Sequence, residues 1–395
     1  MAKKTVRDVD LQGRRALVRV DFNVPYERGT TRISDDIRIR SSLATIRHLR
    51  EHGASVVLCT HLGRPGGVAS EELELAPIAE RLAELLSSPV TYVHDAPGEE
   101  AARMASALAP GGVLLLENLR FWPGEETNDD SFARALAGLA NVYVNDAFGT
   151  AHRAHASTEG VAHHLPAVAG LLMEKEITFL GKVLEEPKRP LAALLGGAKV
   201  SDKLKVLERL VGHADALFVG GGMAATFLKA KGLGIGASLI EEELVGFCAD
   251  VLARSEQAGT TLVLPSDVVI AERIEPGVAS RTVPVGEVAE GWMIVDIGPK
   301  TAADFAKRLG GMGTVVWNGP MGVFEVPPFH TGTRIVAEGL AMGGAVTIIG
   351  GGSTAEAVGQ LGLADEMTHV STGGGASLEF LEGKMLPGVA ALDER

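Results

Sequence analysis

The chain has 395 residues, 46% of them hydrophobic, so it is long enough for two or three domains with their own cores. A formal net charge of −13 and an aromatic content of 5% argue against a general nucleic-acid or anionic-membrane binder. Cys59 and Cys248 stand in apolar surroundings and offer neither a disulfide framework nor a metal-ligand spacing. With no apolar signal region at the start and no long apolar run, we expect a soluble cytoplasmic protein.

In the first half of the chain, predicted strands are followed within a few residues by cationic side chains. Because the carboxyl ends of parallel strands meet at one edge of a sheet, these cations are expected to lie together there. Arginine matches the oxygens of carboxylates and phosphates, so the pattern predicts a pocket for a polyanion, although any one arginine alone could be an ordinary surface residue. The strands are expected near residues 15–25, 54–60, 112–118 and 141–146, with helices from Asp35 and near 75–87. The cations are Arg38, His61, Arg64, Arg120 and Arg153, with His152 as a further candidate.

Four stretches of this half resemble the substrate-side motifs of the phosphoglycerate kinase family, namely residues 20–25, 60–65, 117–121 and 146–153. The resemblance implies that this half binds 3-phosphoglycerate or 1,3-bisphosphoglycerate. It also implies that Arg38 assists the phosphoryl group during transfer. The implied substrate-binding residues are Asp21, Phe22, Asn23, Arg38, His61, Leu62, Gly63, Arg64, Arg120 and Arg153.

Residues 165–186 carry apolar side chains at helical spacing and end at Pro187. This stretch falls between two α/β repeats, so we interpret it as an interdomain helix. A crossover helix inside one large sheet is the alternative, and the family resemblance favours the former. The expected organisation is a first lobe at 1–165, a helix at 166–187, a second lobe at 188–386, and a tail at 387–395 that packs on the first lobe.

A glycine turn with two lysines follows the apolar run at 191–195. Residues 196–203 combine two glycines, Lys199 and Lys203 with a helix start that Ser201 or Asp202 is expected to cap. Unpaired N–H groups at a helix start and two ammonium groups favour phosphate. The alternative is an ordinary strand-to-helix turn with two solvated lysines. The family resemblance assigns Lys199 and Lys203, together with Arg38, to catalysis.

Four further glycine-rich turns predict repeated close approach of the backbone to a nucleotide. They form neither a GxGxxG fingerprint nor a Walker motif, so a nicotinamide dehydrogenase or a Walker-type NTPase is not favoured. The resemblance implies that phosphates are held at Asn318 and at the 351–354 turn, that Glu325 takes the ribose hydroxyls, and that Gly220 begins the turn beside the base. The implied nucleotide-binding residues are Lys203, Gly220, Gly221, Gly222, Asn318, Glu325, Gly351, Gly352, Ser353 and Thr354.

Ser353 departs from the family, which usually has a magnesium-ligating aspartate at this position. A hydroxyl is a weaker ligand, so Mg²⁺ is expected to enter as Mg-ADP or Mg-ATP, with its protein ligands unknown. The resemblance implies two doubly wound, parallel-sheet α/β lobes and reversible, in-line phosphoryl transfer between 1,3-bisphosphoglycerate and ADP in a cleft closed by a hinge. A monomer that binds small molecules, and neither nucleic acid nor membrane, is expected. A non-catalytic two-lobed anion-binding protein is the alternative.

Overall fold

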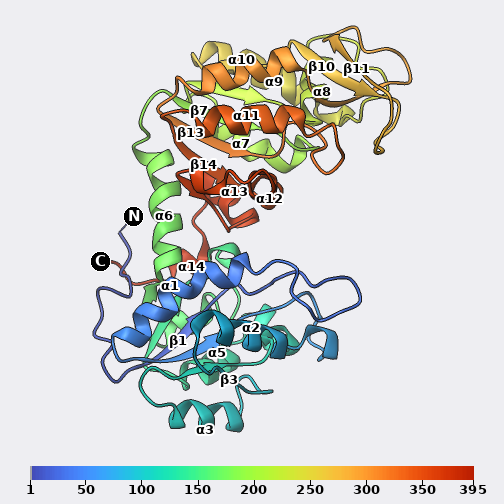
Figure 1. The fold of residues 1–395 in the computed structure, drawn as a ribbon. Coiled ribbons are helices and arrows are strands. Elements are labelled where there is room, and N and C mark those ends of the chain that lie inside the picture. The colour runs from blue at the N-terminus through green and yellow to red at the C-terminus, as the bar shows by residue number, and fades with distance from the viewer. Residues whose placement is uncertain (1) are drawn as a thin grey trace. The chain divides into compact units, whose positions relative to one another are not determined.

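The computed structural model describes residues 2–395, which divide into two compact units. The first unit contains the chain up to Thr178 together with Met385–Arg395, and the second contains Phe179–Lys384. The division falls inside helix α6 (Leu171–Glu185). Each unit is described by itself below (Figure 1).

A six-stranded parallel sheet forms the centre of the first unit. Its strands lie in the order β3-β4-β2-β1-β5-β6. The central strands are short apolar runs buried along their length, as expected for a parallel sheet that is covered on both faces. The strands are β1 (Arg15–Arg19), β2 (Ser55–Cys59), β3 (Thr91–Tyr92), β4 (Val113–Leu115), β5 (Val142–Asn145) and β6 (Ala167–Ala169).

The helices of the first unit bury apolar stripes against this sheet. In α1, Ile39, Ile46 and Leu49 are fully buried, and they belong to the same core cluster as Val18 and Val56. The helices are α1 (Ile37–Glu51), α2 (Ala76–Leu86), α3 (Glu99–Ala107), α4 (Pro123–Glu126), α5 (Asp130–Ala137) and α14 (Pro387–Ala390).

The expected helix at 166–187 is wrong at its start. Ala167–Ala169 form β6, which pairs in parallel with β5. Helix α6 begins only at Leu171, because the carboxylate of Asp146 accepts hydrogen bonds from the N–H groups of Leu172 and Met173, at 2.9 and 3.2 Å. The three apolar residues of β6 happen to fit the helical spacing of the residues that follow them. The hydrophobic pattern therefore did not distinguish the strand from the helix.

The two ends of the chain pair within the first unit. Lys3 forms an antiparallel bridge with Glu394, and the Asp393 N–H donates to the carbonyl of Ala167. Gly388 donates to the carbonyl of Ala151 and accepts from the Asn145 side chain. The last eleven residues therefore belong to the same compact unit as the first strand.

The second unit has its own six-stranded parallel sheet, in the order β15-β14-β13-β7-β8-β9. Trp317 and Phe218 are fully buried, and the Phe218 ring meets the Phe305 ring edge-on at 5.1 Å. The strands are β7 (Leu191–Leu195), β8 (Ala216–Val219), β9 (Thr261–Val263), β13 (Thr314–Asn318), β14 (Val346–Gly350) and β15 (His369–Val370). The helices are α7 (Leu204–Leu210), α8 (Met223–Ala230), α9 (Val245–Gln257), α10 (Pro299–Leu309), α11 (Thr331–Ala341), α12 (Gly352–Gln360) and α13 (Gly375–Leu381). Two parallel α/β sheets were expected, and this fold class is confirmed.

A small antiparallel sheet in the second unit was not expected. Strand β10 (Asp267–Ala271) lies between β11 (Ser280–Pro284) and β12 (Met293–Ile297). Strand β11 is an edge strand with mostly exposed side chains. Because its residues are mostly polar, the strand lacks the alternation of apolar and polar side chains that would have predicted it.

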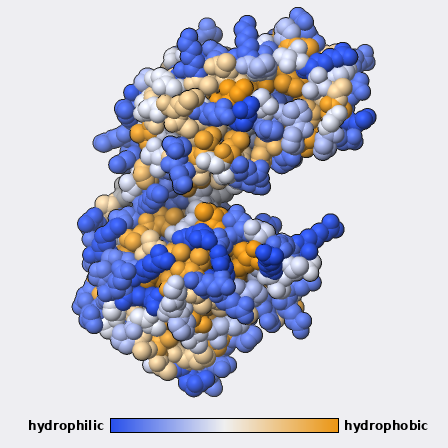
Figure 2. All heavy atoms as spheres, in the orientation of Figure 1, coloured by the Kyte–Doolittle hydropathy of each residue, from blue (hydrophilic) through white to orange (hydrophobic). Residues whose placement is uncertain are grey.

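Hydrophilic residues cover most of the face drawn in Figure 2, and hydrophobic residues reach the surface only in small groups. Among residues 2–395, no helix combines the length and the apolar character needed to span a bilayer. The exposed large hydrophobic residues are Ile37, Val68, Leu239, Ile274, Met342 and Met385.

The strand order reverses once in each sheet. In the first unit the chain leaves β1 toward β2 and later returns to pair β5 on the other side of β1. In the second unit the same reversal separates β7 from β13. Open α/β sheets bind ligands at the carboxyl ends of the strands where the order reverses, so these two places define where to look for a site.

Candidate functional site

A buried histidine in the first unit is surrounded by guanidinium groups. His61, which follows β2, is 3% exposed, and its Nδ1 lies 3.1 Å from an amino group of Arg19. Burial holds the pKa of His61 well below its usual range, and four neighbouring positive charges lower it further. These charges belong to Arg19, Arg120, Arg153 and Arg38. The structure therefore gathers cations that follow different strands around one neutral imidazole.

The turn after β2 is tied to the end of β1. Arg38 donates to the Asp21 carboxylate at 2.7 Å. The Asn23 side chain accepts from the Gly63 N–H at 2.9 Å, and Arg120 donates to the Gly63 carbonyl at 2.7 Å. The Asn23 N–H donates to the Asp21 carboxylate at 3.3 Å, so five of the residues expected at the substrate site are joined in one hydrogen-bonded group.

Arg120 is the least satisfied member of this group. It is 2% exposed, and its Nη2 has no hydrogen-bond partner within residues 2–395. Its Nε lies 3.2 Å from a carboxylate oxygen of Glu126, and burial lowers its pKa. A buried N–H without an acceptor is costly, so the geometry favours an oxyanion at this place.

The other expected substrate residues differ in how they can contribute. Arg64 is exposed and Arg153 is half-buried, so both can reach a ligand. The side chains of Phe22 and Leu62 lie in the core. Their N–H groups already donate to Thr60 and Asn118, so they shape the turn without presenting a side chain to a ligand.

Arg19 and Glu125 were missed by the sequence interpretation. Both are fully buried and are bridged by Ser157, which accepts from Arg19 Nε at 2.8 Å and donates to Glu125 at 2.6 Å. Burial raises the pKa of Glu125, and the charge of Arg19 opposes this rise. The signal available for the pair was Arg19, which follows three apolar residues at the end of β1.

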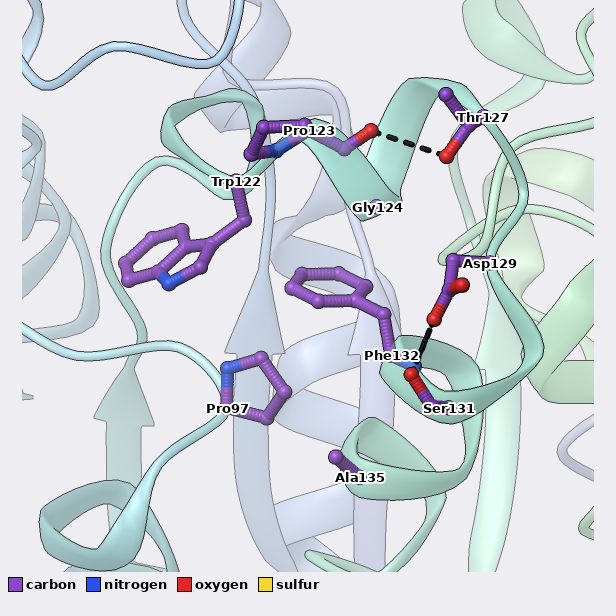
Figure 3. Close-up of a pocket in the computed structure, with 9 residues that line it drawn as sticks. All are labelled: Pro97, Trp122, Pro123, Gly124, Thr127, Asp129, Ser131, Phe132 and Ala135. Carbon is purple, nitrogen blue, oxygen red and sulfur yellow. Dashed lines mark hydrogen bonds between the residues drawn. The ribbon is translucent and has the colours of Figure 1, made fainter.

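A pocket of about 550 Å³ follows directly after the Arg120 turn (Figure 3). The rings of Trp122, Phe132 and Pro97 gather around it, while the Asp129 carboxylate caps α5 by accepting from the Phe132 N–H. No arginine, lysine or histidine lines this pocket. This pocket therefore differs in chemistry from the group of arginines around His61.

The lysine turn of the second unit differs from the expectation. Ser201 and Asp202 do not cap a helix, because residues Ser201–Lys203 form a short 3₁₀ turn before α7. The N–H groups of Val200 and Ser201 both donate to the Glu241 carboxylate, at 2.6 and 3.0 Å. The turn's own amides are thus already bound to an internal anion.

Glu241 is held in its charged form by this turn. Partial burial pushes its pKa upward, but the bonds from Ser201 and Val200 and the charge of Lys199 outweigh burial and lower the pKa. Lys199 is exposed, whereas Lys203 is 7% exposed and burial lowers its pKa. Of the two lysines, Lys203 is the one whose ammonium group lies inside the structure.

Glycine turns in the second unit pack against one another. The Gly197 N–H donates to the Pro320 carbonyl at 2.8 Å, and the Gly221 N–H donates to Met321 at 2.9 Å. A Cβ on Gly319, whose φ is +97°, would lie 2.2 Å from the Gly196 carbonyl oxygen. These glycines therefore permit the close approach of one turn to another. The sequence interpretation had attributed the close approach to a ligand.

The remaining expected nucleotide residues lie at the ends of β13 and β14. Asn318 is buried, and its Nδ2 would lie 2.9 Å from a Cβ on Gly351, so the two turns adjoin. Thr354 is buried and accepts from the Gly319 N–H at 2.7 Å. Ser353, in the first turn of α12, and Gly352 are exposed, as is Glu325. The structure joins Asn318, Gly351 and Thr354, and leaves Ser353 and Glu325 open to solvent.

Each unit also contains a buried carboxyl group near a helix start whose pKa is raised by burial. Burial raises the pKa of Asp146 to about 6, against the opposing bonds from Thr45, Met173 and Leu172. Burial likewise raises the pKa of Asp296 to about 7, against the N–H groups of Gly332 and Ile297.

These features define a two-unit α/β protein with cationic side chains at the reversal of one parallel sheet and packed glycine turns at the reversal of the other. Residues 6–384 match the sequence model of the phosphoglycerate kinase family. The chain belongs to this family and is a phosphotransferase.

Relatives and solved structures agree with this assignment. The chain is similar to the phosphoglycerate kinases of Moorella thermoacetica and Chloroflexus aurantiacus, each 55% identical over 100% of both chains. It also resembles the solved structures of phosphoglycerate kinase from Coxiella burnetii (40% identity, TM-score 0.89) and Pyrococcus horikoshii (33% identity, TM-score 0.82), each over 98% of both chains.

Proposed function

We propose that the protein catalyses reversible phosphoryl transfer between 1,3-bisphosphoglycerate and ADP, giving 3-phosphoglycerate and ATP. The observation that carries this proposal is the gathering of four guanidinium groups around the buried, neutral His61. A three-carbon acid phosphate offers the carboxylate and phosphate oxygens that such a group would bind.

In the first unit, Asp21 and Asn23 fix the turn that carries His61 and Gly63, through the bonds to Arg38 and the Gly63 N–H. Arg120, with its unsatisfied N–H, is the primary oxyanion donor in the proposal. Arg64 and Arg153 add positive charge beside it. Arg38 binds the substrate and stabilises the phosphoryl group during transfer.

In the second unit, we propose that the nucleotide phosphates are bound by Lys203, Asn318 and the turn at 351–354. Lys203 supplies a buried ammonium group, which a phosphate would stabilise in its charged form. Glu325, which is exposed, takes the ribose hydroxyls, and Gly220–Gly222 line the base side. Lys199 is exposed beside Glu241 and assists the transferring group.

The chemistry suits a site built from cations. The attacking oxygen of ADP or of the carboxylate is already ionised, so transfer needs no general base. Neutralising the equatorial oxygens and aligning the two ligands are the main catalytic requirements. Arginines, lysines and backbone N–H groups meet these requirements.

Magnesium is proposed to enter with the nucleotide. At the expected position the chain offers the exposed hydroxyl of Ser353, while the Thr354 hydroxyl already accepts from Gly319. Hydroxyls are poor substitutes for carboxylates as Mg²⁺ ligands, so phosphate oxygens and waters would supply most of the coordination. The ion's contribution would be to neutralise charge on the phosphates.

We further propose a cytoplasmic monomer that acts on small molecules. Both cysteines are free and buried, which is typical of a reducing compartment. Light scattering that gave the mass of more than one chain would contradict the monomer.

A coupled assay for ATP formation from 1,3-bisphosphoglycerate and Mg-ADP tests the proposed reaction. We expect turnover with the wild-type chain, and Lys203→Met to lower kcat at least ~100-fold, since a transition-state charge contact is lost. Lys205→Met, an exposed lysine two residues away, is the matched control and should leave kcat unchanged. Binding of phosphoglycerate without any ATP formation would instead support the non-catalytic anion-binding protein.

A further inference from the structure

Three side chains capable of binding a metal ion meet at one edge of the first sheet. Glu74, His94 and Glu117 bring one ligand atom each within 4.8 Å of one another. The Nδ1 of His94 lies 3.7 Å from a Glu117 oxygen. The three residues are separated by 20 or more positions along the chain, so the fold itself assembles them.

The cluster carries negative charge that no neighbouring cation balances. Glu117 is 3% exposed, and within residues 2–395 neither glutamate forms an ion pair with a lysine or arginine. Burial, with a smaller contribution from the Glu117 charge, raises the pKa of Tyr26 to about 12, and among residues 2–395 the buried Tyr26 hydroxyl has no hydrogen-bond partner. A buried carboxylate without a counter-charge is unfavourable, and a divalent cation would relieve it.

Hydrogen bonds already orient the central ligand. One oxygen of Glu117 accepts from the N–H groups of Leu75 and Asn118, at 3.2 and 2.7 Å. The Tyr92 hydroxyl donates to the other oxygen, and the Tyr92 ring packs edge-on against the His94 ring at 4.6 Å. Metal-binding carboxylates are typically held by such outer contacts, which fix the direction of the free lone pair.

We propose that Glu74, His94 and Glu117 form a binding site for one divalent cation of the zinc class, with water as the fourth ligand. An imidazole with two carboxylates suits Zn²⁺, whereas Mg²⁺ prefers an all-oxygen shell. The site is therefore distinct from the magnesium that accompanies the nucleotide. Glu74 is half-buried and the His94 side chain is exposed, so both can move toward a bound ion.

The position of the site links it to the substrate turn. Asn118, the next residue after Glu117, accepts from the N–H groups of Leu62 and Arg120. A cation that fixes Glu117 would hold the end of β4 and thereby the turn that carries Arg120. Zinc occupancy is expected to stabilise this edge of the first unit.

Zinc titration of the full chain, without substrate or nucleotide, tests the site. In competition with a chromogenic chelator, we expect one Zn²⁺ to bind to the wild-type chain. Glu74→Gln and His94→Asn should each weaken binding at least 10-fold, while Glu72→Gln, an exposed glutamate in the same turn, should not.

Thermal unfolding provides the second readout. Added Zn²⁺ should raise the Tm of the wild-type and Glu72→Gln chains, because a ligand that binds only the folded state stabilises it, and should not raise that of Glu74→Gln. Equal Zn²⁺ affinity in the wild-type and Glu74→Gln chains would overturn the proposal. Because no substrate is present, this outcome is independent of the phosphoryl-transfer assay.

Discussion

In the first unit, the candidate site is made of long charged side chains that follow different strands and meet around His61. In the second unit, the strand ends meet through their backbones, with carbonyl and N–H groups of three glycine turns bonded to one another. Both arrangements lie where the strand order of a parallel sheet reverses. The same topology therefore supports two different arrangements at the strand ends, one built from charged side chains and one from packed backbone turns.

The difference has consequences for what each unit tolerates. Buried charges depend on their partners, so the first unit should respond most strongly to the loss of a single charge. Packed backbone turns leave no room for a Cβ, so the second unit should respond most strongly to the addition of a single carbon. The changes below test this contrast, in order of decreasing expected effect.

Arg19→Met should have the largest effect on the first unit. It removes the more strongly interacting of the two positive charges that stabilise the fully buried Glu125 carboxylate, and such losses typically cost about 3–5 kcal/mol. Hydrogen exchange read by mass spectrometry would measure the two units separately. Adding Glu125→Gln should recover part of the loss, and an equal or greater loss in the double variant would contradict the charge argument.

Gly319→Ala should be the corresponding change in the second unit. The new Cβ would lie 2.2 Å from a backbone oxygen at a φ of +97°, and we expect a loss of about 3 kcal/mol. Gly359→Ala, inside α12 with nothing near its Cβ position, is the control. It should stabilise the unit by up to about 1 kcal/mol, because alanine favours helix. Similar hydrogen-exchange protection in both variants would remove the backbone-packing argument.

Asp146→Asn should alter the pH dependence of stability in the first unit. The folded pKa of about 6 lies above the unfolded value, so Asp146 contributes most below pH ~4 and its contribution is lost as the pH rises through about 6. The variant keeps an acceptor for Leu172 and Met173 but cannot ionise. Between pH 4 and 7 the wild type should lose about 2–3 kcal/mol relative to it in denaturant unfolding. Asp10→Asn, an exposed control, should leave the wild-type profile unchanged.

Glu241→Gln should have a modest effect on the lysine turn. The amide still accepts from Val200 and Ser201 but removes the charge beside Lys199, so we expect a loss of about 1 kcal/mol. The KM for Mg-ADP should rise while the KM for phosphoglycerate stays constant. Glu242→Gln, the exposed neighbour, is the matched control, and equal KM values in both variants would show that Glu241 does not position the turn.

Ser353→Asp would test the contrast between the two units further, because it adds a charged side chain to the unit whose strand ends meet through backbone groups. It should tighten Mg-ADP binding several-fold, since a carboxylate is a stronger Mg²⁺ ligand than a hydroxyl. Calorimetry with Ser353→Asn as the neutral control measures this. An unchanged or weaker affinity in the aspartate form would show that the metal does not reach this position.

The contrast also explains what the sequence could reveal. Cations after strands were predictable, because parallel strands place their ends at one edge, and His61 and Arg120 do lie together. The role of Glu241 was not predictable. It accepts a hydrogen bond from the Ser201 N–H, 40 positions away in the sequence, and no local pattern indicates such a contact. The role of Gly319 was not predictable either, since a glycine permits close approach without showing whether a ligand or another turn approaches.

Because Lys3 pairs with Glu394, the first unit can complete its fold only after the end of the chain has been synthesised. The segment from Met385 onward leaves the ribosome only after the whole second unit, a delay on the order of 10–40 s. Until then, Asn145 and Ala151, which Gly388 covers in the finished chain, remain without these contacts. The first unit therefore begins to be synthesised first and is completed last. A chain released before Gly388 would leave Asn145 and Ala151 without these contacts.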